Sequence, residues 1–180
     1  MLKLRTATLE DRETLRALIV RSARELSKGD YRPEQVEGAL LGAFGVDSQL
    51  ILDGTFFVVE DGTVLVGCGG WSFRRTLFGG DQGANRDAGE LDPRTEAAKI
   101  RAFFVDPAHA RRGIGTLLLE KCESEARERG FVRVELMSTL TGLRLYAARG
   151  FSGTQQVRYE LAPGLTIEFV PMSKVLQEPA

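Results

Sequence analysis

Residues 97–119 have the sequence AAKIRAFFVDPAHARRGIGTLLL, and this stretch decides the fold. Its first half is an apolar, extended segment that stops at Asp106-Pro107, because proline cannot continue a central strand and disfavours helix at the residue before it. Its second half begins a helix after Arg112, with apolar residues recurring at helical spacing as far as Cys122. We therefore expect a buried strand that leads through a short charged connection into an amphipathic helix.

The start of this expected helix is a candidate anion site. Gly113 and Gly115 follow directly after Arg111 and Arg112. The first amides of a helix lack partners and carry partial positive charge, and glycine lets a phosphate approach the backbone closely. Glycines also serve close helix packing, so these residues alone leave both interpretations open. The P-loop pattern is absent, and the dinucleotide-binding pattern fails at Leu118, where its third glycine would stand.

Outward from this stretch, hydrophobic periodicity predicts further strands and helices. We expect strands at 2–7, 55–60, 63–72, 97–105, 131–137, 156–161 and 165–172, and helices at 11–29, 33–42, 113–130 and 141–149. Asp61-Gly62 predicts a hairpin turn, and the polar segment 74–94 predicts a surface loop. The order β-α-α-β-β-β-α-β-α-β-β indicates an α/β fold with a mixed sheet, and we expect residues 1–180 to form one domain.

Composition excludes several classes of protein. Basic and acidic residues number 24 and 25, so no global field would draw the chain to nucleic acid or to an anionic membrane. No apolar run approaches the ~20 residues of a membrane span, and the first residues lack a signal peptide's apolar stretch. Cys68 and Cys122 have no metal-ligand neighbours at short spacing, which indicates buried free thiols. We expect a cytoplasmic protein without a metal site.

The stretch 100–119 resembles the acetyl-CoA-binding motif of the GNAT-type N-acetyltransferases. Residues 145–151, LYAARGF, resemble the family's second signature, a helix with a tyrosine followed by Gly-Phe. Residues 4–8 and 169–174 are also similar to family members, so the resemblance spans nearly the whole chain. It implies a GNAT-like mixed, mostly antiparallel central sheet flanked by helices.

The resemblance also implies a site and a reaction. The backbone of the strand would pair with the pantetheine arm, the helix start would hold the pyrophosphate, and the thioester would lie where two central strands separate. Tyr146 would give a proton to the departing CoA sulfur. Acetyl-CoA would be the acyl donor, and a small-molecule or peptide amine would accept the acetyl group directly. The implied cofactor-binding residues are Phe103, Phe104, Val105, Arg111, Arg112, Gly113, Ile114, Gly115 and Thr116.

The sequence departs from the family at two positions. Ala110 stands where the family commonly has Gln or Arg, and Lys99 stands where some members carry a catalytic glutamate. The general base is therefore open between Glu135, Glu96, an acid of the loop such as Glu90 or Asp92, and a chain of water molecules. Lys99 and Arg101 share a strand face and could pair with acids such as Glu135 or orient an acidic acceptor. His109 lies nearer the phosphate end than the thioester.

The sequence leaves other functions and the acceptor open. A catalytically weak CoA-binding sensor or structural module would keep the same fold, and a phosphate-binding regulator would use the same helix start. We expect the acceptor pocket at the loop 74–94 and the first two helices, near Tyr31, Trp71 and Phe73. An exposed sheet edge at the C-terminal hairpin could support a homodimer.

Overall fold

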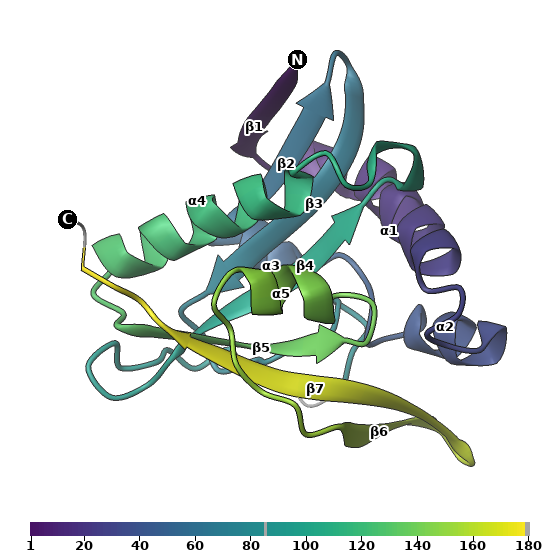
Figure 1. The fold of residues 1–180 in the computed structure, drawn as a ribbon. Coiled ribbons are helices and arrows are strands. Elements are labelled where there is room, and N and C mark those ends of the chain that lie inside the picture. Colours follow the sequence, from purple (N-terminus) through teal and green to yellow (C-terminus); the bar gives the residue numbers. More distant parts are fainter. Residues whose placement is uncertain (85, 179–180) are drawn as a thin grey trace.

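The computed structural model describes residues 1–84 and 86–178, and its strands form one mixed sheet (Figure 1). The strand order is β1-β2-β3-β4-β5-β7-β6. Neighbouring strands are antiparallel, except that β4 and β5 are parallel. The bounds are β1 Leu2–Thr6, β2 Phe56–Asp61, β3 Val64–Ser72, β4 Ala98–Val105, β5 Arg133–Thr139, β6 Val157–Ala162 and β7 Leu165–Val175. The predicted mostly antiparallel sheet is confirmed.

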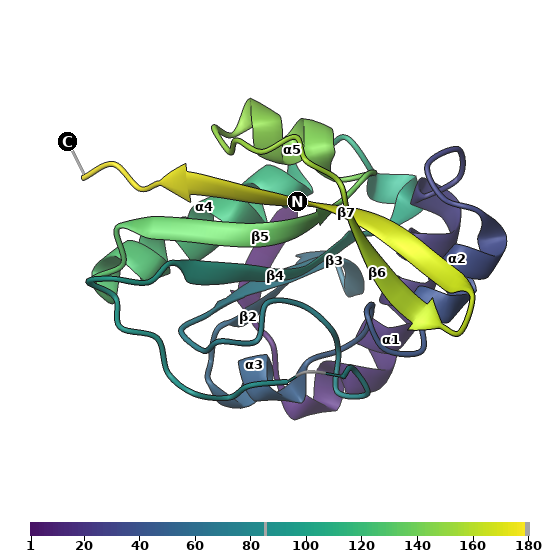
Figure 2. The same cartoon turned by 90° about the horizontal axis from the view of Figure 1, so that it is seen from below.

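Helices cover both faces of this sheet. Figure 2 shows α4 and α5 on one face and α1, α2 and α3 on the other. The bounds are α1 Arg12–Leu26, α2 Pro33–Ala39, α3 Ser48–Leu52, α4 Ile114–Glu128 and α5 Leu143–Ala148, with short 3-10 turns at Leu9–Asp11 and Pro107–His109. The predicted order lacks only α3. Five residues are too few to show a helical period, and this helix depends on Asp47, whose carboxylate accepts from the Gln49 amide at 3.0 Å.

Each face of the sheet has its own hydrophobic core. The core beneath α4 contains Ile114, Leu118 and Cys122, while the core beneath α1 contains Leu15, Leu18 and Ile19. These residues are almost fully buried, and they are the apolar stripes that the helical periodicity predicts. Both cysteines are free and buried, in agreement with the expected buried thiols.

The segment between β3 and β4 is a polar loop, as the sequence predicts, but it is tied to its neighbours. Arg74 pairs with Asp53 at 2.7 Å and forms an isolated β-bridge with Glu90. Arg86 pairs with Asp47 at 2.8 Å. These contacts hold the loop over the end of the sheet next to α3. In the described residues, every helix is too short or too polar to cross a bilayer.

Candidate active site

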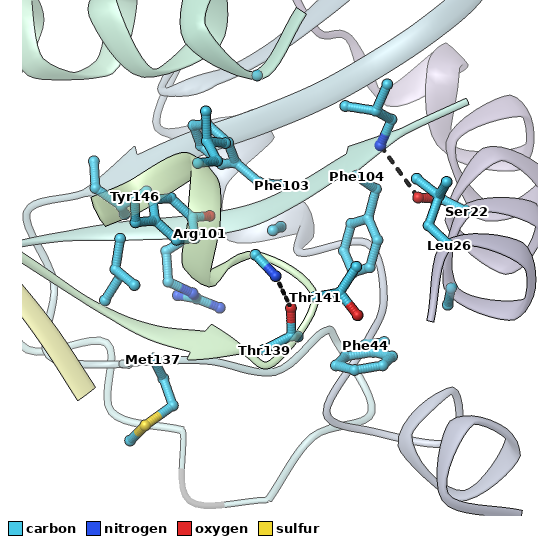
Figure 3. A pocket seen from close by; sticks show the side chains of 18 of the residues that line it. Ser22, Leu26, Phe44, Arg101, Phe103, Phe104, Met137, Thr139, Thr141 and Tyr146 are labelled. Carbon is cyan, nitrogen blue, oxygen red and sulfur yellow. Dashed lines mark hydrogen bonds between the residues drawn. The ribbon is translucent and has the colours of Figure 1, made fainter. Parts of the chain in front are cut away.

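A cavity of about 790 Å³ opens where β4 and β5 separate (Figure 3). The two strands pair only at Ala98 with Val134 and at Lys99 with Glu135. Beyond these pairs, the cavity is lined by both strands, by α1 and α5, by the start of α4 and by part of the loop. The parallel strands thus provide the gap that the family resemblance implies.

A β-bulge in β4 determines which side chains reach each side of this cavity. Cys68 pairs with Phe104 and Gly70 pairs with Arg101, so Gly69 lies opposite two residues, Ala102 and Phe103. Ala102 has a positive φ of 56°, which absorbs the extra residue. After the bulge, Phe103 packs with the α4 core and Phe104 with the α1 core.

One end of the cavity, where the family resemblance implies a phosphate site, lies at the start of α4. Gly113 caps this helix with a φ of 81°, and the Leu117 amide donates to the Gly113 carbonyl at 2.9 Å. The amides of Ile114, Gly115 and Thr116 therefore precede the helical hydrogen-bond ladder. A side chain at Gly113 would meet no atom within 4 Å, so this turn is open toward solvent.

The structure brings most of the predicted cofactor-binding residues to this cavity. Eight of them line it: Phe103, Phe104, Val105, Arg111, Gly113, Ile114, Gly115 and Thr116. The Arg112 side chain is placed elsewhere, because its guanidinium donates to Asp61 at 3.0 Å in the β2–β3 turn. His109 lies nearby, with its Nδ1 3.1 Å from a carboxylate oxygen of Asp106.

Backbone groups of β4 face the gap. The Asp106 amide donates to Val66 of β3 at 2.8 Å, so the alternate residues Phe103 and Val105 direct their backbone groups away from β3. The Val105 amide donates to the hydroxyl of Ser22 at 3.2 Å, as a dashed line in Figure 3 shows. Ser22 was not among the predicted site residues, although its position on the buried face of α1 placed it near the sheet.

Tyr146 lies on α5 and lines the middle of the cavity. Its ring packs beside Phe103 at 6.2 Å and Phe151 at 5.6 Å, and only 8% of its surface is exposed. Burial is the main cause that raises the pKa of Tyr146 above its ordinary value. The hydroxyl therefore keeps its proton throughout the physiological pH range.

Sequence and structure comparisons agree with this geometry. The family described as the Acetyltransferase (GNAT) family matches residues 21–151. The chain belongs to the GNAT acetyltransferase family. No curated protein sequence matches it.

Solved structures similar to this GNAT chain cover nearly its whole length. A GCN5-related N-acetyltransferase from Rhodopseudomonas palustris has a TM-score of 0.72 at 21% identity, over 97% of this chain and 95% of that one. The PaiA N-acetyltransferase of Thermoplasma acidophilum has a TM-score of 0.66 at 15% identity, over 97% and 99%. The putative acetyltransferase YncA of Salmonella typhimurium has a TM-score of 0.64 at 18% identity, over 100% and 96%. At these identities the likeness concerns the fold.

The acids considered as general base lie outside the cavity lining. Glu135 pairs with Lys99 at the closed end of the β4–β5 gap, which is the pairing considered for Lys99. Glu96 accepts from the Asp92 amide at 2.7 Å, Asp92 pairs with Arg94, and Glu90 lies 4.0 Å from Arg129. Among the described residues that line the cavity, none is an aspartate, a glutamate or a histidine.

Two of the elements expected to form the acceptor pocket, α1 and the loop, line the far end of the cavity, whereas no residue of α2 does, and the aromatic residues there differ from those expected. α1, the α2–α3 connection and loop residues 77–79 contribute to it. Tyr31 is instead buried, donating to the Glu168 carbonyl at 2.6 Å, while Trp71 and Phe73 pack against each other in the α4 core. The aromatic side chains present are Phe44, Phe78, Phe104 and Phe169.

Proposed function

We propose that this GNAT chain is an N-acetyltransferase that transfers the acetyl group of acetyl-CoA directly to an amine. One observation carries the proposal: a single cavity connects the amides at the start of α4, the gap between β4 and β5, Tyr146 and an aromatic end. Two of the similar structures contain coenzyme A or acetyl-CoA, which supports the same donor here.

The residues at the phosphate end fit a diphosphate. Helix amides and the guanidinium of Arg111 both favour an anion, and the positive φ of Gly113 leaves the approach to these amides free of a side chain. Gly115 lies close to Leu145, since a Cβ there would come within 2.8 Å of it, so this glycine also lets α5 pack against α4. The geometry of Gly113 thus supports the proposed anion site, and that of Gly115 supports the helix-packing interpretation.

In the proposed reaction, the amine nitrogen attacks the thioester carbonyl, a C–N bond forms and the C–S bond breaks. The Tyr146 hydroxyl donates its proton to the leaving sulfur and regains a proton that the acceptor nitrogen loses. A positioned proton donor contributes about 10²–10⁴-fold to such a step. Neither cysteine fits a covalent intermediate, since Cys68 and Cys122 are buried and burial raises the pKa of Cys68 to about 12.

Two measurements test this function. Calorimetric titration with coenzyme A, acetyl-CoA and ATP should show binding of the first two and no binding of ATP. Release of free thiol from acetyl-CoA should then depend on an added amine. Binding of acetyl-CoA without thiol release for any amine would instead support a CoA-binding module, and binding of ATP alone would support a phosphate-binding regulator. The cytoplasmic location, the homodimer and the absence of a metal, nucleic acid or membrane partner stay predictions.

A further inference from the structure

The far end of the cavity is lined mostly by apolar side chains, and the charged side chain of Arg101 lies beside them. We propose that the acceptor is a primary amine on a compact apolar or aromatic body, which binds uncharged and carries no second positive charge. This inference rests on the proposed acetyl transfer and specifies the substrate class for the same site.

Aromatic side chains from four separate segments form the wall of this end. Phe44 and Phe104 lie edge to face at 5.7 Å, and Phe78 and Phe169 lie edge to face at 5.4 Å. Figure 3 shows Phe44 and Phe104 on the α1 side of the cavity, across from Tyr146. Leu26 and Met137 also line the cavity. Such a surface gains free energy by removing apolar area of a ligand from water, at about 25 cal/mol per Å².

The charges next to this wall disfavour a cation. Arg101 lines the cavity, and its side chain is only 2% exposed. Its guanidinium shares the carboxylate of Asp47 with Arg86, at 2.7 Å and 2.8 Å, so two positive charges meet one negative charge. Arg101 is the member of this cluster that lines the cavity, and Arg86 and Asp47 lie behind it. An ammonium group here would therefore meet the positive charge of Arg101 and no lining carboxylate in the described part of the chain.

The same surroundings would help the amine to react. An apolar site without a counter-ion disfavours the charged form and lowers the pKa of a bound amine. The acceptor would then be present as its nucleophilic free base without a carboxylate to remove the proton. This accounts for a cavity in which no described lining residue is an acid. Aromatic faces can attract cations, but the net positive charge of the Arg86–Asp47–Arg101 cluster opposes that attraction.

The test compares two acceptors that differ by one charge. Benzylamine and 1,4-bis(aminomethyl)benzene share the same ring, and the second carries an extra ammonium. We expect kcat/KM to be higher for benzylamine by about tenfold or more, the effect of one unfavourable pKa unit. Spermidine should be poorer still. Equal or faster acetylation of the diamine or of spermidine would overturn the inference while leaving acetyl transfer intact.

A variant pair tests the role of the wall itself. Phe78 lies on the loop and is half-buried, so it is the wall residue best suited to substitution. Phe78→Asp places a carboxylate at the wall, and the kcat/KM ratio of diamine to benzylamine should rise by about tenfold. Phe78→Leu is the matched control and should keep the original preference. An unchanged ratio in a Phe78→Asp protein that still binds acetyl-CoA would contradict the inference; if that variant does not fold, the comparison of wild-type acceptors decides.

A binding measurement separates this inference from the proposed reaction. With coenzyme A present, benzylamine should raise the melting temperature of the protein and the diamine should not. If no amine releases thiol but this difference is observed, the proposed reaction fails, and only the preference of this end of the cavity for a singly charged aromatic amine as a ligand stands. If thiol is released but the diamine stabilises the protein as strongly as benzylamine, the acceptor class fails.

Discussion

Asp47→Asn is expected to destabilise the protein and to weaken acceptor use without weakening donor binding. Asp47 is 1% exposed and joins three segments of the structure. Its carboxylate accepts from Arg101, from Arg86 and from the Gln49 amide at the start of α3. Asparagine has nearly the same size, so the change removes charge and leaves two guanidiniums without a counter-ion.

The magnitude follows from the burial of this cluster. Removing one partner of a buried ion pair costs about 3–5 kcal/mol. For a chain of this length, 1 kcal/mol lowers the melting temperature by about 2–4 °C, so a fall on the order of 10 °C is expected. Both arginines also donate to the Gly79 carbonyl, at 2.7 Å and 3.2 Å, which holds the loop beside Phe78. Loss of this support should therefore raise the KM for the amine.

Thermal unfolding, acetyl-CoA calorimetry and amine kinetics measure the three effects separately. The donor dissociation constant should stay unchanged, because Arg111 and the start of α4 lie at the other end of the cavity. Asp92→Asn is the matched control: Asp92 pairs with an Arg94 side chain that is 87% exposed, so its melting temperature should not change. If Asp47→Asn melts within about 2 °C of the wild type, or if donor affinity falls as much as acceptor use, the reasoning is refuted.

Three further predictions concern the donor site and the buried tyrosines. Tyr146→Phe should lower kcat about tenfold or more with acetyl-CoA affinity nearly intact; an unchanged rate would remove Tyr146 as proton donor. Gly113→Ala should weaken acetyl-CoA binding in calorimetry, because a non-glycine residue at φ 81° is strained by about 1–2 kcal/mol and relief of this strain would turn the first amides of α4 away from the proposed anion site, whereas Gly164→Ala, at φ 78° in the β6–β7 turn, should not affect binding. Burial raises the pKa of Tyr31 to about 12, so the unfolded chain loses this proton first as the pH rises above its ordinary value of 10. The free energy of unfolding, measured in urea, should therefore fall between about pH 10 and 12, and less steeply in Tyr31→Phe.

Local patterns of the sequence predicted most of the fold. The stop at Asp106-Pro107, the Asp61-Gly62 turn and the spacing of Ile114, Leu118 and Cys122 each depend on neighbours in the chain. The helix-start residues of the proposed donor site were predictable for the same reason, because helix geometry fixes which amides are free. The direction of the Arg112 side chain was not predictable in this way, because it donates to Asp61, which lies 51 residues away in the sequence.

The proposed acceptor end was not predictable from local patterns, because it is assembled from distant segments. Phe44, Phe78 and Phe169 come from the α2–α3 connection, the loop and β7. Asp47 and Arg101 are 54 residues apart, and no spacing rule links them. Tyr31 and Trp71 are aromatic residues of the same part of the chain and were therefore expected at the acceptor pocket. Their polar groups instead donate hydrogen bonds away from the cavity, Tyr31 to the Glu168 carbonyl and Trp71 to the Glu125 carboxylate. Only the tertiary contacts distinguish the two groups of aromatic residues.

A single backbone irregularity links the two halves of the site. Without the bulge at Ala102, strict alternation along β4 would place Phe104 on the α4 side and Phe103 on the α1 side. The extra residue reverses this order, so Phe103 packs beside Tyr146 and Phe104 beside Phe44. Gly69 permits the change, because a Cβ there would lie 2.5 Å from the Phe103 ring. The proposed proton donor and the proposed acceptor wall therefore depend on the same bulge, since it supplies each of them with its neighbouring aromatic ring.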